Sequence, residues 1–88
     1  MKLILAVIQD IDRDYVSQAL ITASFRVTHI ASTGGFLRRG STTFMIGVDD
    51  EKVEQAIEII RQNLSPETDP ATRRATLFVL KVDNFTQL

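Results

Sequence analysis

The amino-acid sequence predicts an α+β fold with the element order β-α-β-β-α-β. Four short segments rich in branched apolar residues have the composition of strands, and two other segments carry apolar residues at helical spacing. Connections that contain glycine or proline separate several of these elements. With 88 residues, of which 44% are hydrophobic, the chain can bury one core, so we expect a single domain over residues 1–88.

The first strand and the first helix are predicted at residues 3–8 and 12–23. The first of these segments is a continuous apolar run, which is typical of a buried strand. Asp10 and Asp12 follow it and offer carboxylate oxygens that can cap the start of a helix. The helical spacing of apolar residues predicts a buried helix face made of Tyr15, Val16, Ala19, Leu20 and Ala23.

A more polar strand is predicted at residues 25–32, followed by a third strand at 41–48 and a second helix at 50–63. Alternate residues of a strand point to the same side, so Arg26, Thr28 and Ile30 of the polar strand share one face. Asp49 and Asp50 can cap the second helix. Its buried side is expected to comprise Val53, Ala56, Ile57, Ile60 and Leu64.

Two prolines within residues 65–70 end the second helix, and residues 76–82 predict the fourth strand before a short tail. This order of elements is that of the ferredoxin-like, or split βαβ, fold. Right-handed crossovers place strands 3–8 and 41–48 at the centre of a four-stranded antiparallel sheet. The two helices then cover one face of that sheet.

The second face of the predicted sheet is also apolar. Strand 3–8 is apolar at both its odd and its even positions, and strand 76–82 is nearly so. An antiparallel sheet with one solvated face should instead alternate between apolar and polar residues. We therefore expect a homo-oligomer that buries this face, which is worth on the order of 10 kcal/mol per subunit before entropic costs. An ordinary exposed apolar patch is the alternative.

The composition excludes several classes of site. The chain has no cysteine, which rules out disulfides and thiolate chemistry. Its formal net charge of −1 provides no general attraction to nucleic acid or anionic lipid. No apolar stretch approaches the length of a membrane span, so we expect a cytoplasmic protein. No spacing of acidic residues marks a metal site, and no cofactor is expected.

The most unusual stretch is the glycine-rich hairpin segment at residues 33–47. Its glycines leave room for another molecule to approach the backbone, and Phe36 offers a flat stacking surface. Arg38-Arg39 lies in this segment, and Arg73-Arg74 lies in the second long connection, which the topology places at the same end of the sheet. These features indicate a site for an anionic ligand with a flat base. The alternative is a surface loop with solvated arginines.

These residues resemble the PII-like signal-transduction family of bacterial cyclic di-AMP receptors. The most specific run is Ala31-Ser-Thr-Gly-Gly-Phe-Leu37, which continues through Gly40 and Thr42-Thr-Phe-Met-Ile-Gly-Val48. Further similar stretches are Val7-Ile-Gln-Asp10, Phe25-Arg-Val-Thr28 and Ala75-Thr-Leu-Phe-Val-Leu-Lys-Val-Asp83. The resemblance implies a non-catalytic homotrimer with a ligand site in each cleft between subunits, which relays binding to a protein target that the sequence does not identify.

The resemblance also implies roles for individual residues. Arg26 would bind a phosphate, and Thr28 would contact the base or the sugar. Phe36 and Leu37 would enclose the base. Gly47 would provide clearance at the backbone. The remaining implied ligand-binding positions are Gly35 and Ser41.

The chain departs from the family pattern at several positions. Ser41 and Ser24 stand where asparagines are expected, and a hydroxyl cannot supply the paired donor and acceptor of an amide. The connection at residues 63–74 is shorter than in the family. These departures leave another adenine nucleotide or another anion open as the ligand.

Two further function classes share this element order. A small ferredoxin-like enzyme such as an acyl-phosphate hydrolase needs an arginine cradle and an amide that positions water, and amides near the loops are sparse. His29, the one histidine, has no obvious Asp or Ser constellation and is expected to be structural or packed at a subunit contact. An RNA-recognition module needs exposed aromatic residues on its central strands, and strand 3–8 has none.

Overall fold

The computed structural model describes residues 1–30, 40–66 and 74–88 of the chain. It confirms the predicted ferredoxin-like order of elements. The strands are β1 (Lys2–Gln9), β2 (Arg26–Ile30), β3 (Ser41–Val48) and β4 (Ala75–Lys81). The helices are α1 (Arg13–Thr22) and α2 (Val53–Gln62), each preceded by a short 3₁₀ turn, η1 (Asp10–Asp12) and η2 (Asp50–Lys52).

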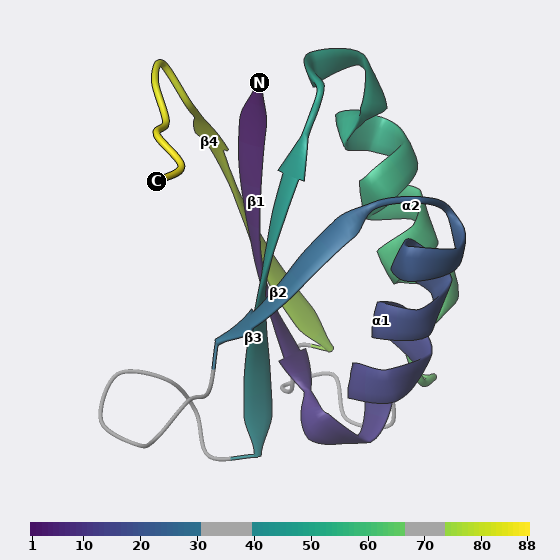
Figure 1. Ribbon diagram of the computed structural model, residues 1–88. Coiled ribbons are helices and arrows are strands. Elements are labelled where there is room, and N and C mark those ends of the chain that lie inside the picture. The colour runs from purple at the N-terminus through teal and green to yellow at the C-terminus, as the bar shows by residue number, and fades with distance from the viewer. Residues whose placement is uncertain (31–39, 67–73) are drawn as a thin grey trace.

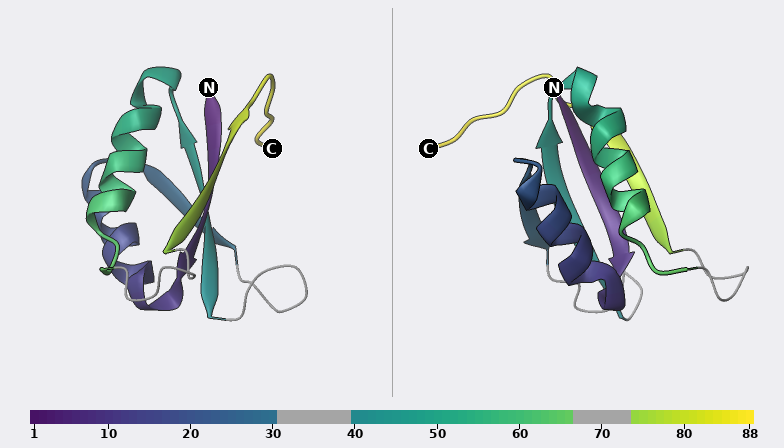
Figure 2. Two further views of the ribbon diagram at one scale, coloured as in Figure 1. Left: turned by 180° about the vertical axis from the view of Figure 1, so that it is seen from behind. Right: turned by 90° about the vertical axis from the view of Figure 1, so that its right-hand side faces the viewer.

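The four strands form one antiparallel sheet in the order β2-β3-β1-β4. As predicted, β1 and β3 are central and the polar β2 lies at an edge. Both helices pack on the same side of the sheet, which Figure 1 and the two turned views in Figure 2 show. No helix of the described residues covers the opposite side of the sheet, which is called the open face below.

The core lies between the helices and the sheet. Alternate residues of β1 and β3 point into it, and α1 and α2 close it from the other side. A side chain on one face of a strand is followed by one on the other, so the pairing register fixes which residues can reach the helices. The buried apolar residues are Ile4, Ala6, Ile8, Val16, Leu20, Phe25, Phe44, Ile46, Val48, Ala56 and Ile60.

The buried face of α1 differs from the prediction. Val16 and Leu20 are fully buried, whereas Tyr15 is 69% exposed and Ser17 is buried in its place. Successive helical residues are rotated by about 100°, so a face centred on Val16 and Leu20 turns Tyr15 outward. In α2 the prediction was closer, because Ala56 and Ile60 are buried and Val53, Ile57 and Leu64 pack partly buried against the core.

The predicted carboxylate caps are not formed. Asp12 and Asp49 occupy N-cap positions of α1 and η2, but neither side chain makes a capping hydrogen bond. The turns η1 and η2 precede the helices, and their acidic side chains bond elsewhere. Asp12 accepts hydrogen bonds from Ser65, and Asp50 pairs with the α-amino group of Met1 at 2.9 Å.

Candidate ligand-binding site

Three of the residues singled out in the sequence lie together on the open face. Arg26 of β2 is paired with Gly47 of β3, and Thr28 is paired with Met45 two positions further along. Because alternate residues share a face, Arg26 and Thr28 point to the same side, as predicted. Both are exposed, so their polar groups are accessible at this edge of the sheet.

A surface hollow of about 200 Å³ lies beside Arg26 and Gly47. Its lining includes the basic residues Arg26 and Lys52 and one carboxylate, Asp49. Two cationic groups at the rim of a small hollow, with a glycine in its wall, suit an anionic group such as a phosphate. The hollow also includes Met1, Ala23, Ser24, Phe25, Val48 and Gln55.

Ser24, one of the two positions where an asparagine was expected, lies directly after α1. Its φ is 70°, in the left-handed region, and its N–H donates to the Ile21 carbonyl at 2.9 Å. Among residues other than glycine, asparagine tolerates this conformation best. An asparagine at this position would therefore suit the backbone as well as any ligand contact.

The remaining predicted site residues lie at the other end of the sheet or outside the described residues. Ser41 begins β3, six positions before Gly47, which corresponds to about 20 Å along the strand. The two residues therefore do not share one pocket within a single chain. Gly35, Phe36 and Leu37 lie outside the described residues, as do the arginines at positions 38, 39 and 73.

The two long connections leave the sheet at the same end, as the topology predicted. Strands β1 and β2 end there, β3 and β4 begin there, and α2 ends there, which is the lower end in Figure 1. Of the two arginine pairs, only Arg74 lies among the described residues. Its Nη1 donates a hydrogen bond to the Ser65 carbonyl at 3.3 Å, across the second connection.

The base of the glycine-rich hairpin is tied to the turn η1. The Asp10 N–H donates to the Gly40 carbonyl at 2.7 Å, and the Thr42 hydroxyl donates to Asp10 Oδ1 at 2.6 Å. Asp12, expected to cap the start of a helix, is only 1% exposed and accepts from both the N–H and the hydroxyl of Ser65. No local pattern relates these two residues, which are 53 positions apart, so sequence reasoning missed the contact.

The open face is apolar over its centre. Leu5 is flanked by Met45 of β3 and Phe78 of β4, and Leu3 is flanked by Gly47 and Leu80. Phe78 is 52% exposed in the single chain. Arg26 and Thr28 border this apolar surface on the β2 side, so these polar residues lie at the rim of a face that neither α1 nor α2 covers.

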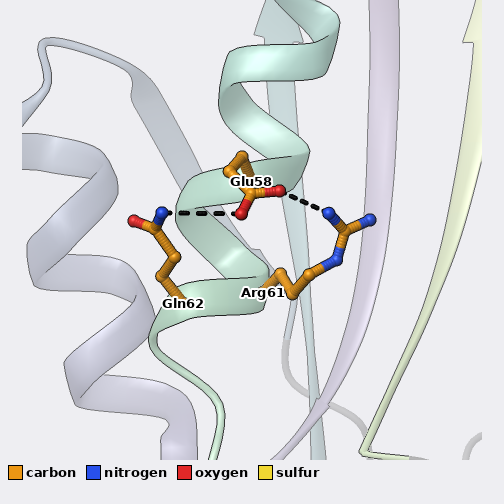
Figure 3. A network of polar contacts seen from close by, with 3 residues as sticks. All are labelled: Glu58, Arg61 and Gln62. Carbon is orange, nitrogen blue, oxygen red and sulfur yellow. Dashed lines mark hydrogen bonds and ion pairs between the residues drawn. The ribbon is translucent and has the colours of Figure 1, made fainter.

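The outer surface of α2 carries a separate polar network, shown in Figure 3. Glu58 lies between Arg61, with which it forms an ion pair, and Gln62, whose Nε2 donates to Glu58 Oε1 at 3.5 Å. Exposed pairs within one helix contribute only about 0.3–0.5 kcal/mol. Arg61 is therefore engaged on the helix, away from Arg26 and Gly47.

Within the described parts of the chain, no three metal-ligating side chains gather into a cluster. His29 is exposed, and its ring meets the buried Phe44 edge-on, with ring centroids 4.7 Å apart. No helix in the same residues is long and apolar enough to cross a bilayer.

Comparison with known proteins gives similarities of two kinds, to a family model and to solved structures. A family model described as cyclic-di-AMP receptor matches residues 1–70. A solved structure of a functionally unknown protein from Pediococcus pentosaceus ATCC 25745 is 38% identical and superimposes with a TM-score of 0.78. That similarity covers 99% of this chain and 96% of the other, so it extends over nearly the whole length of both chains.

Proposed function

Because the chain belongs to the cyclic-di-AMP receptor family, we propose that it is a non-catalytic receptor that binds cyclic di-AMP and relays binding to a protein target. The observation that carries this proposal is the placement of Arg26 beside Gly47, with Thr28 two positions along on the same side of β2, at the rim of an apolar sheet face. This arrangement offers charge for a phosphate and space for a ligand beside the backbone.

The receptor is proposed to be a homotrimer. The open face has apolar side chains at its centre, among them Leu5, Met45 and Phe78, and an exposed apolar surface of this kind favours burial against other copies. In addition, Ser41 and Gly47 are about 20 Å apart along β3, so one subunit alone does not gather them into one site. A neighbouring subunit then supplies the residues that complete the site.

Each site residue then has a proposed task. Arg26 pairs with a phosphate, and Thr28 donates to the base or sugar. Phe36 and Leu37 enclose an adenine, Gly35 and Gly47 allow the ligand close to the backbone, and the Ser41 hydroxyl provides one hydrogen bond. Because a hydroxyl provides fewer contacts than an amide, adenine would be read here with fewer hydrogen bonds than an asparagine allows.

Isothermal titration tests the proposal directly. Purified protein would be titrated with cyclic di-AMP and, separately, with ATP and with inorganic phosphate. We expect saturable heat with cyclic di-AMP at one site per subunit and a rise in melting temperature. Binding of ATP alone would assign another adenine nucleotide to the same site, and absence of heat and thermal shift with all three would refute ligand binding here.

A further inference from the structure

The turn η1 touches the bases of both long connections. On one side Asp10 holds the end of the glycine-rich hairpin, through the Gly40 carbonyl and the Thr42 hydroxyl. On the other side, Asp12 holds Ser65, whose carbonyl accepts a hydrogen bond from Arg74. Two sets of hydrogen bonds, joined by the short backbone of η1, thus form a network that links the start of β3 to the start of β4.

Asp12 is the residue of this network whose burial is least favourable for folding. It is 1% exposed, and its Oδ1 accepts from the Ser65 N–H at 3.1 Å and from the Ser65 hydroxyl. Its Oδ2 is buried and has no hydrogen-bond partner among the residues that the structure describes. A buried carboxylate with one oxygen unmatched is unfavourable for folding alone. A helix-capping role does not account for it, because the side chain makes no capping bond.

We propose that Asp10 and Asp12 are positioning residues that couple the base of the hairpin to the base of the second connection. Asp10 orients Gly40 and Thr42, and Asp12 orients Ser65 and, through it, Arg74. Where a ligand acts at the hairpin, the same turn transmits the change to Ser65. That last step rests on the proposed function, whereas the coupling between the two bases does not.

The geometry of η1 makes such coupling direct. Only one residue separates the two carboxylates, and the Arg13 N–H donates to the Asp10 carbonyl, which closes the turn. Hydrogen bonds to ionised carboxylates are about twice as strong as neutral ones. A displacement of Thr42 therefore moves Asp10, and the closed turn carries Asp12 and Ser65 with it.

The first experiment needs no ligand. Thr42→Val keeps the shape of the side chain and removes the donor to Asp10 Oδ1. Amide hydrogen exchange is measured at Ser65, whose N–H donates to Asp12, and at Ile4 in the central strand as a reporter of global opening. We expect exchange at Ser65 to become at least fivefold faster while exchange at Ile4 changes by less than twofold.

Thr22→Val is the matched control. It removes an exposed threonine hydroxyl that accepts a hydrogen bond from Gln18 on α1, and neither residue belongs to the network around η1. Exchange at Ser65 should be unchanged in this variant. Equal exchange at Ser65 in Thr42→Val, Thr22→Val and the wild type would refute the coupling.

The second experiment runs in the opposite direction. Ser65→Ala removes the hydroxyl donor to Asp12, and cyclic di-AMP affinity is measured by titration at a temperature where the variant is fully folded. We expect a three- to tenfold weaker affinity, although Ser65 lies outside the proposed ligand contacts. An unchanged affinity would refute transmission between the two bases. If the wild type fails to bind cyclic di-AMP, the proposed function is wrong, and the exchange experiment still decides the coupling.

Discussion

Gly47 lies opposite Arg26, and the terminal Cε of Met1 occupies the space beside it. A Cβ placed on Gly47 would lie 2.9 Å from that methyl carbon. Gly47 is also paired with Leu3 on its other side, so it sits between a charged edge residue and the apolar centre of the open face. The missing side chain leaves a space beside β3, at the end of the sheet where Arg26 lies, and the flexible end of Met1 fills it in the single chain.

Gly47→Ala should fold and bind cyclic di-AMP more weakly. The added methyl meets only the flexible end of Met1, which can move, so we expect the free energy of unfolding to change by less than about 1 kcal/mol. The same methyl enters the space proposed for the ligand, and we expect at least tenfold weaker affinity. Chemical denaturation and calorimetric titration measure the two effects, and unchanged affinity would remove Gly47 from the site.

Arg26→Ala should weaken cyclic di-AMP binding by about 1.5–3 kcal/mol, the usual contribution of a hydrogen bond to a charged group. The loss should grow smaller as salt concentration rises, because screening weakens the wild-type contact. Arg61→Ala is the matched control, since it removes an exposed arginine that pairs with Glu58 on α2. Equal losses in the two variants would point to overall charge as the cause and would exclude a specific contact by Arg26.

The fold was predictable from the sequence because the signals for it are local. The apolar run of β1 and the spacing of Ala56 and Ile60 in α2 each lie within one element, and crossover handedness then sets the strand order. The rotation of α1 was not predictable, because Tyr15 and Val16 are neighbours that both fit the helical spacing of apolar residues. Only packing against the sheet decides which of them is buried.

The candidate site was predictable only in part. That Arg26 and Thr28 share a face follows from strand alternation alone. The bond from Asp12 to Ser65 joins residues far apart in sequence, and a carboxylate before a helix is typical of a cap, so the sequence favours the wrong partner. The same applies to Asp50, whose partner is the α-amino group of Met1.

Phe78→Lys should break the proposed trimer. Phe78 lies beside Leu5 on the open face and is 52% exposed in one chain, so a charge at this position would have to be buried between subunits. Val79→Lys is the matched control, because Val79 is 44% exposed and points to the opposite side of the same strand. Light-scattering mass at micromolar concentration should give three subunits for wild type and Val79→Lys, and one for Phe78→Lys.

A wild-type mass of one subunit would refute the trimer and, with it, the cleft between subunits. A trimer that persists in Phe78→Lys would instead move the interface to another surface. Either result is independent of ligand, so it tests the assembly separately from cyclic di-AMP binding.

The ion pair between Met1 and Asp50 should make stability depend on pH in the acid range. The hydrogen bond and charge of the α-amino group lower the pKa of Asp50 from its ordinary value of 3.8. The pair therefore stabilises the fold fully above that ordinary value, and this stabilisation is lost as pH falls through the lower folded-state pKa. Asp50→Asn should accordingly be less stable than wild type at pH 6, and the difference should shrink as pH falls below 3.8. Glu51→Gln is the control, because it removes a carboxylate from the same turn without touching the α-amino group. Its stability difference from wild type should not change with pH when denaturation is measured from pH 6 to pH 2.

A constant difference between Asp50→Asn and wild type from pH 6 to pH 2 would mean that the contact contributes through its shape and not through its charge.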